Sequence, residues 1–111
     1  MAHRDILLEL VELARPTSEL EQLAHMYPYD YEGTPVSLTR DHLKNVLTQC
    51  IEGRIPPRDL ERWAGLIEGR PGIDYEAGHE EQLSEVLFQL STPEINEVLT
   101  PQKCWRLLNS L

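Results

Sequence analysis

Apolar residues recur at the spacing of an α-helix along most of this chain. The clearest repeat lies in residues 55–70, where four apolar side chains fall at relative positions 0, 3, 4 and 7, on one face of a 3.6-residue period. Two prolines precede this repeat, in the first turn where a helix tolerates them, and glycines follow it. The four apolar residues are Leu60, Trp63, Ala64 and Ile67.

Trp63 stands at the centre of that predicted helix. Burying one tryptophan can remove up to ~250 Å² of surface from water, so a single residue of this type can dominate a small core. We expect Trp63 to lie in the core. The alternative is that it belongs to a binding surface.

The same period predicts further helices, separated by prolines, glycines and capping residues. Thr17 or Ser18 is expected to cap the second helix, Thr39 the third and Thr100 the last, because each hydroxyl precedes an apolar-periodic run. Pro101 suits the first position of the last helix. The further helices are expected at residues 3–14, 17–26, 38–52, 79–90 and from 101 onwards.

The segments between these helices contain no long alternation of apolar and polar residues, so no strand is expected. Residues 71–78 form a connection that Ile73 and Tyr75 are expected to pin to the core. Residues 94–99 predict a short helical turn or an irregular segment, with Ile95, Val98 and Leu99 turned inward. The pattern as a whole predicts an all-α fold: a single compact bundle of five or six short helices, with residues 1–111 as one domain.

Three alternating tyrosines mark the predicted loop at residues 27–37. Tyrosine is enriched at the energetic centres of protein interfaces, so Tyr27, Tyr29 and Tyr31 could belong to an interaction surface. In the alternative interpretation, the three rings seal the edge of the core while their hydroxyl groups reach water.

The formal net charge of −9 is concentrated in one segment. Residues 71–102 contain seven acidic residues and no lysine or arginine, whereas the remainder has twelve acidic against ten basic residues. This distribution disfavours direct nucleic-acid binding, which needs clustered lysine and arginine to neutralise phosphates. The acidic segment is therefore either a solvated face or a surface complementary to a basic partner.

Motifs for catalysis or for a cofactor are not evident. The sequence has no glycine-rich phosphate loop, and its four histidines are scattered singly, without the spacing of metal ligands. Paired carboxylates occur by chance in an acidic protein and do not indicate acid–base catalysis. We predict no enzyme activity, no metal and no cofactor, and we keep an enzyme or metal protein as the third hypothesis.

Cysteine content and hydropathy indicate the cellular compartment in which the protein is expected. Cys50 and Cys104 do not make a disulfide framework, and the apolar position of Cys50 predicts an inert thiol in the core. No apolar run approaches the ~20 residues that a membrane helix needs. We expect a cytoplasmic protein with reduced thiols and no membrane contact.

Two long stretches carry a resemblance to known proteins. LTRDHLKNVLTQCIEGRIPPRDLERWAGLIEGRPGIDYE, followed by LFQLSTPEINEVLTPQ, resembles small bacterial all-helical proteins of unknown function, with their Leu-x-x-Trp-Ala helix, Asp-Tyr-Glu connection and Leu-x-x-Pro-Glu-Ile segment. In size, helix content and acidity the chain is also similar to the immunity proteins that neutralise colicin D-type nucleases. That resemblance implies that carboxylates of the acidic segment occupy the site of a basic toxin, in place of RNA phosphates.

Two functional hypotheses lead. The first is a non-enzymatic, acidic protein-binding module, in its most concrete form an immunity or inhibitor protein against a basic nuclease toxin. The second is a structural or regulatory helical protein that associates with itself, with exposed apolar surface around Trp105. For the first hypothesis, the candidate contacts are Asp74, Glu76, Glu80, Glu81 and Glu85, with Tyr29, Tyr31 and Tyr75 as anchors.

Overall fold

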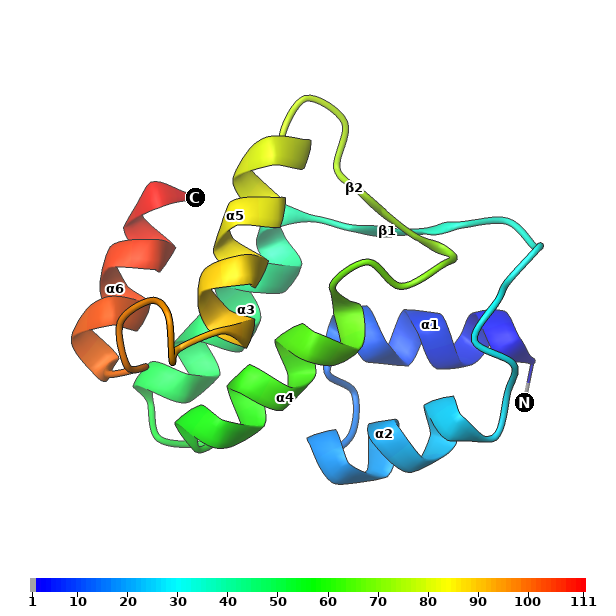
Figure 1. Ribbon diagram of the computed structural model, residues 1–111, viewed down its shortest axis with the longest axis horizontal. Coiled ribbons are helices and arrows are strands. Elements are labelled where there is room, and N and C mark those ends of the chain that lie inside the picture. The colour runs from blue at the N-terminus through cyan, green and yellow to red at the C-terminus, as the bar shows by residue number, and fades with distance from the viewer. Residues whose placement is uncertain (1) are drawn as a thin grey trace.

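Six helices and one short parallel sheet make up the computed structural model, which describes residues 2–111 (Figure 1). The all-α fold class with six helices is confirmed, and the predicted bounds differ from the observed ones by at most three residues. In chain order the elements are α1 (His3–Glu12), α2 (Thr17–His25), β1 (Val36–Leu38), α3 (Arg40–Ile51), α4 (Pro57–Ile67), β2 (Ile73–Tyr75), α5 (Glu80–Ser91) and α6 (Pro101–Ser110).

The two strands correct the expectation that the chain forms none. β1 pairs with β2 in parallel, with Val36 opposite Ile73 and Leu38 opposite Tyr75. Each strand has only three residues, too few to produce a recognisable alternation in the sequence. Their apolar side chains nevertheless lie in the core, since Val36, Leu38 and Ile73 are all buried. Leu38, expected to begin a helix, therefore ends a strand instead.

Trp63 lies at the centre of the core, as predicted. Its side chain is 0% exposed, and the indole Nε1–H donates a hydrogen bond of 2.7 Å to the backbone carbonyl of Leu10. This contact joins α4 to α1 across 53 residues of sequence. Cys50 and Cys104 are buried free thiols, which confirms the core position predicted for Cys50.

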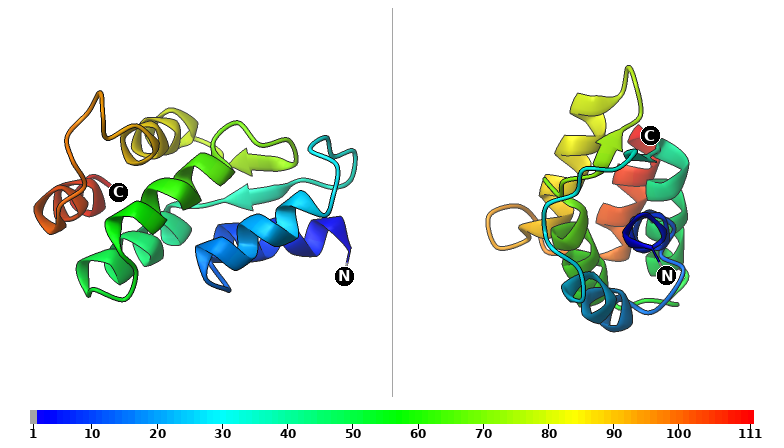
Figure 2. Two further views of the ribbon diagram at one scale, coloured as in Figure 1. Left: turned by 60° about the horizontal axis from the view of Figure 1, so that its bottom comes forward. Right: turned by 90° about the vertical axis from the view of Figure 1, so that its right-hand side faces the viewer.

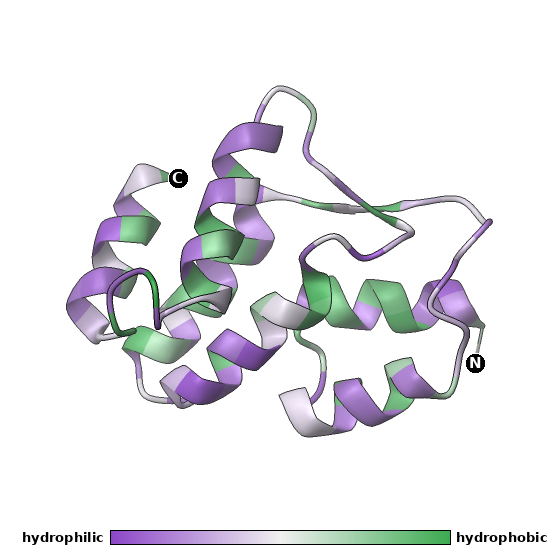
Figure 3. Cartoon of the chain, viewed as in Figure 1, coloured by the Kyte–Doolittle hydropathy of each residue, from purple (hydrophilic) through white to green (hydrophobic). Residues whose placement is uncertain are grey.

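The helices pack mainly in pairs. α3 packs against α6 and α4 against α5, while α2 packs against both α1 and α4, which also contact each other (Figure 2). The last helix, α6, thus packs mainly on α3. The core is made of apolar residues from all six helices and both strands. Figure 3 shows apolar stretches, in green, alternating with hydrophilic ones along the helices. Among residues 2–111, no helix is long and apolar enough to span a bilayer.

Two of the three predicted caps are confirmed. Thr39 accepts a hydrogen bond from the backbone N–H of His42, and Thr100 accepts one from Lys103. At α2 the prediction is wrong, because Pro16 occupies the capping position without a side-chain bond. The Thr17 hydroxyl is instead buried and donates to the carbonyl oxygen of Asp59.

Candidate partner-binding surface

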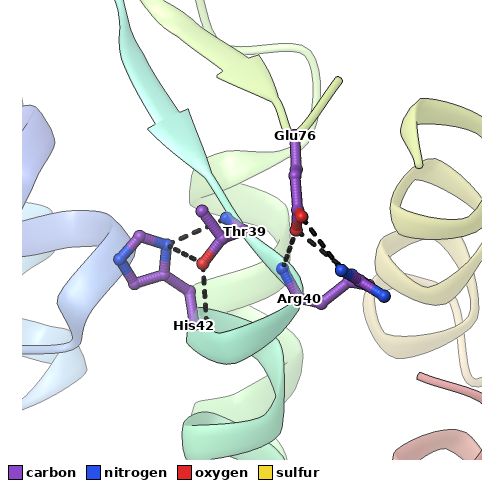
Figure 4. A network of polar contacts seen from close by, with 4 residues as sticks. All are labelled: Thr39, Arg40, His42 and Glu76. Atoms are coloured by element: carbon purple, nitrogen blue, oxygen red, sulfur yellow. Dashed lines mark hydrogen bonds and ion pairs between the residues drawn. The ribbon is translucent and has the colours of Figure 1, made fainter. Parts of the chain in front are cut away.

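Glu76, one of the predicted contact residues, already has a partner within the protein. Its carboxylate accepts a hydrogen bond of 2.9 Å from the backbone N–H of Arg40, and both oxygens also contact the Arg40 guanidinium (Figure 4). These hydrogen bonds lower the pKa of Glu76. Because Arg40 is the first residue of α3, Glu76 fastens the end of β2 to the start of that helix.

His42 completes this corner of the molecule on the side of Thr39 (Figure 4). The backbone N–H of Thr39 donates to His42 Nδ1 at 2.9 Å, so Nδ1 is the unprotonated nitrogen of a neutral ring. Together with the bond from His42 N–H to the Thr39 hydroxyl, this makes a reciprocal capping box. Burial lowers the pKa of His42, which favours the neutral ring that the cap needs.

The three predicted tyrosine anchors differ in their surroundings. Tyr75 is half-buried, and burial raises its pKa. Tyr31 donates a hydrogen bond of 2.8 Å to the Thr34 carbonyl, and its ring lies so close to Gly72 that a Cβ there would approach it to 2.5 Å. Only Tyr29 is largely exposed, at 57%, with the Arg70 guanidinium 5.1 Å from its ring centre.

The acidic residues of α5 have no cationic partner among residues 2–111, although Glu85 accepts a hydrogen bond of 3.1 Å from the Gln89 amide. Glu80, Glu81 and Glu85 are exposed, and none of the ion pairs within residues 2–111 includes them. Asp74 on β2 is likewise exposed. Glu81, Glu85 and Phe88 follow one another at helical spacing along the exposed side of α5.

The eight predicted contact residues do not form one surface. The α2–β1 connection, which carries Tyr29 and Tyr31, lies on the right of Figure 1, whereas α5 lies on the left of centre. Figure 2 shows the same separation from a second direction. A partner that covers the α5 carboxylates would therefore leave these two tyrosines outside its contact area.

The connection between α5 and α6 contains exposed apolar residues that the sequence pattern placed inside. Leu99 is buried at 5% exposure, as expected, but Ile95 and Val98 are 69% and 72% exposed. The expectation that all three turn inward is therefore wrong for two of them. Trp105, on the outer side of α6, is 51% exposed. Proline at position 93 and the loss of helical period were the only sequence signals of an irregular segment here.

Polar contacts hold this connection in place. The Lys103 ammonium donates a hydrogen bond of 2.8 Å to the Glu97 carbonyl, and the Glu97 carboxylate pairs with the Arg106 guanidinium at 3.0 Å. Asn96 donates to the Thr92 hydroxyl at 2.8 Å, which closes a turn. The outward position of Ile95 and Val98 therefore belongs to a defined backbone conformation.

We call the exposed residues at this end of the molecule the C-terminal surface. They come from α5, from α6 and from the connection between them, on the left side of Figure 1. Four are apolar and three are acidic. The C-terminal surface consists of Glu80, Glu81, Glu85, Phe88, Ile95, Val98 and Trp105.

Comparisons with known proteins identified no relative of this chain. No family model matches the chain, and no curated protein or solved structure is significantly similar to it. The resemblance to small bacterial helical proteins and to colicin D-type immunity proteins therefore stays a prediction. Within the described residues, no three histidine, cysteine, aspartate or glutamate side chains are grouped so that they could hold a metal ion.

Proposed function

We propose that this chain is a non-enzymatic protein-binding module that contacts its partner through the C-terminal surface. One observation carries the proposal: a fixed connection displays Ile95 and Val98 to solvent instead of burying them. Large apolar patches on the surface of a soluble protein mark interaction sites.

The fixed backbone favours tight binding. Association costs free energy when flexible loops and side chains become ordered at an interface. Here the hydrogen bond from Lys103, the Glu97–Arg106 pair and the buried Leu99 side chain already hold the connection. A partner would therefore gain the burial of Ile95 and Val98, worth roughly 25 cal/mol per Å² of apolar area, without ordering a loop.

The charge on the exposed side of α5 points to a basic partner. Glu80, Glu81 and Glu85 have no cationic partner within residues 2–111, and residues 71–102 contain no lysine or arginine. Unpaired surface carboxylates speed association with a cationic protein and add specificity. In its most specific form, the proposal is an inhibitor or immunity protein whose carboxylates occupy the phosphate-binding site of a basic nuclease toxin.

A capture experiment tests the proposal with a matched control. Immobilised wild-type protein is compared with the double variant Ile95→Asp/Val98→Asp and with Met26→Asp, because Met26 is 75% exposed at the end of α2, outside the C-terminal surface. We expect wild type and Met26→Asp to capture the same basic protein from a native lysate, released by high salt, and the double variant to lose it. Equal capture by all three proteins would overturn the proposal.

Self-association is the second candidate, and the half-exposed Trp105 ring favours it. Sedimentation at increasing concentration distinguishes the two. A mass that rises with concentration in wild type, but not in Trp105→Ala, supports self-association. A constant monomer mass together with capture of a basic protein supports the binding module.

A further inference from the structure

A groove lies between α5 and α6, because these helices pack on different neighbours. α6 packs against α3 and α5 against α4, which leaves a cavity of about 370 Å³ between them. Gln82, Val86 and Gln89 line it from α5, and Lys103 and Leu107 from α6. Its volume falls at the lower end of the range for small-ligand sites, roughly 300–1,000 Å³.

The wall of this groove contains a buried cation. Lys103 is only 2% exposed, although lysine is almost never buried to this extent without a charged partner. Its ammonium has three N–H donors, and one of them meets the Glu97 carbonyl. This is the only hydrogen bond that the ammonium donates to residues 2–111.

No carboxylate of the described chain forms an ion pair with Lys103, and Glu97 acts on its charge only from a longer distance. The Glu97 carboxylate pairs with Arg106 instead, and none of the ion pairs within 4.0 Å involves the lysine. Burial lowers the pKa of Lys103, which reflects the cost of holding this charge away from water. A negatively charged group placed in the groove would offset that cost.

We propose that the α5–α6 groove binds a small ligand with a carboxylate on an apolar body, and that Lys103 is the counter-ion of the carboxylate. Val86 and Leu107 are buried apolar residues that would contact the body of the ligand. The Gln82 amide already donates to the Ser110 carbonyl, and the Gln89 amide to the Glu85 carboxylate. The second N–H and the amide oxygen of each would serve polar groups of the ligand. The groove adjoins the C-terminal surface and shares Glu85 with it, but the ligand proposed here is a small molecule rather than a protein.

The surroundings favour a carboxylate over a phosphate group. Glu85 also lines the groove, and the other cation there, Arg106, is already paired with Glu97. A doubly charged phosphate would meet one unneutralised cation and one nearby carboxylate. A carboxylate carries one negative charge, which matches the one cation of the groove without an ion pair, the Lys103 ammonium.

The test uses N-acetyl-leucine and its neutral analogue N-acetyl-leucinamide, which differ only in the carboxylate. Backbone amide signals of the wild-type protein are followed by NMR during titration with each compound. We expect saturable shifts confined to α5 and α6, with a Kd of about 1 mM for the acid. The amide should bind about tenfold more weakly or worse, since a charge-assisted hydrogen bond is lost.

A lysine variant has a matched control in the same chain. Lys44, on α3, is the only other lysine, and it does not line the groove. Lys103→Met should weaken binding of N-acetyl-leucine about 10- to 100-fold, whereas Lys44→Met should leave it unchanged. Thermal melts verify that both variants are folded. If Lys103→Met does not fold, the affinities of the wild-type protein for N-acetyl-leucine and N-acetyl-leucinamide are sufficient to test the proposal.

A third arm distinguishes two sources of the carboxylate. Acetyl-alanyl-alanyl-leucine mimics the C-terminus of a peptide, and it is compared with N-acetyl-leucine on the wild-type protein. Tighter binding of the peptide acid would identify a chain terminus as the ligand, and equal affinity would identify a small free acid. Absence of saturable shifts, equal binding of acid and amide, or shifts outside α5 and α6 would overturn the proposal.

Discussion

The corner where β2 meets α3 and the surface formed by α5 and α6 use similar residues in opposite ways. At the corner, Glu76 pairs with Arg40, and Thr39 exchanges hydrogen bonds with His42. No exposed large apolar residue lies among these four. At the C-terminal surface, Glu80, Glu81 and Glu85 have no ion-pair partner in residues 2–111, and Trp105 is half-exposed. Changes at the corner should therefore affect stability, whereas changes at the C-terminal surface should affect association.

The two tryptophans give the largest expected contrast. Trp63→Ala removes a fully buried ring and its hydrogen bond to Leu10, and should lower the free energy of unfolding by about 3–5 kcal/mol. Trp105→Ala removes a ring that is 51% exposed, and should cost roughly 1 kcal/mol. Urea denaturation of both variants measures the difference. Equal losses would show that Trp105 is as much a part of the core as Trp63.

Removing the cap of α3 should cause an intermediate loss of stability. Thr39→Ala leaves the His42 backbone N–H without its acceptor, and losing such a cap costs about 1 kcal/mol. Thr39→Ser keeps the hydroxyl and serves as the control, with stability close to wild type in the same urea series. A Thr39→Ala protein as stable as the serine variant would contradict a structural role for this corner.

Protonation of His42 should weaken the same cap. Burial lowers its pKa below the usual 6.5, so the unfolded chain binds a proton more readily than the folded protein. The stabilising contribution is therefore complete above pH 6.5 and is lost as the pH falls through the lowered pKa of the folded state.

A glutamine variant isolates this effect. His42→Gln retains a side chain that suits a capping box and does not titrate, so its stability should fall less than that of wild type between about pH 7 and about pH 5. Denaturation curves across this range measure both proteins. Parallel curves for wild type and variant would rule out His42 as the titrating group.

Neutralising Glu76 or Glu85 should give the smallest difference in stability between two variants. Glu76→Gln weakens the contacts with Arg40 and should lower the melting temperature. Glu85→Gln alters an exposed carboxylate without an ion pair among the described residues, and should change stability by no more than about 0.5 kcal/mol. Calorimetry compares the two. A larger loss for Glu85→Gln would mean that the acidic face has a structural role.

The helices could be predicted because their apolar residues repeat over two or more turns. Leu60, Trp63, Ala64 and Ile67 in α4 are all buried, as their spacing indicated. The short strands could not be predicted, since three residues show no period and their partners lie 37 positions away. For the same reason the sequence did not reveal that Glu76 pairs with Arg40, 36 residues earlier.

The C-terminal surface was predicted only in part. Runs of glutamate indicated an exposed side of α5, and that exposure is confirmed. The outward position of Ile95 and Val98 was missed, because hydropathy favours the core for both residues. Their position depends on contacts from Lys103 and Arg106 to Glu97, which are set by tertiary structure rather than by local pattern.

The β1–β2 pairing has a consequence for the order of folding. It joins segments separated by the whole of α3 and α4, so the intervening chain must first bring its ends together, at a loop-closure cost that local helix formation avoids. We therefore expect the sheet to form after these helices. The Val36 amide, which donates to Gly72 in the folded protein, should gain protection in pulsed hydrogen exchange later than amides inside α3. Earlier protection of Val36 would reverse that order and make the sheet the nucleus of the fold.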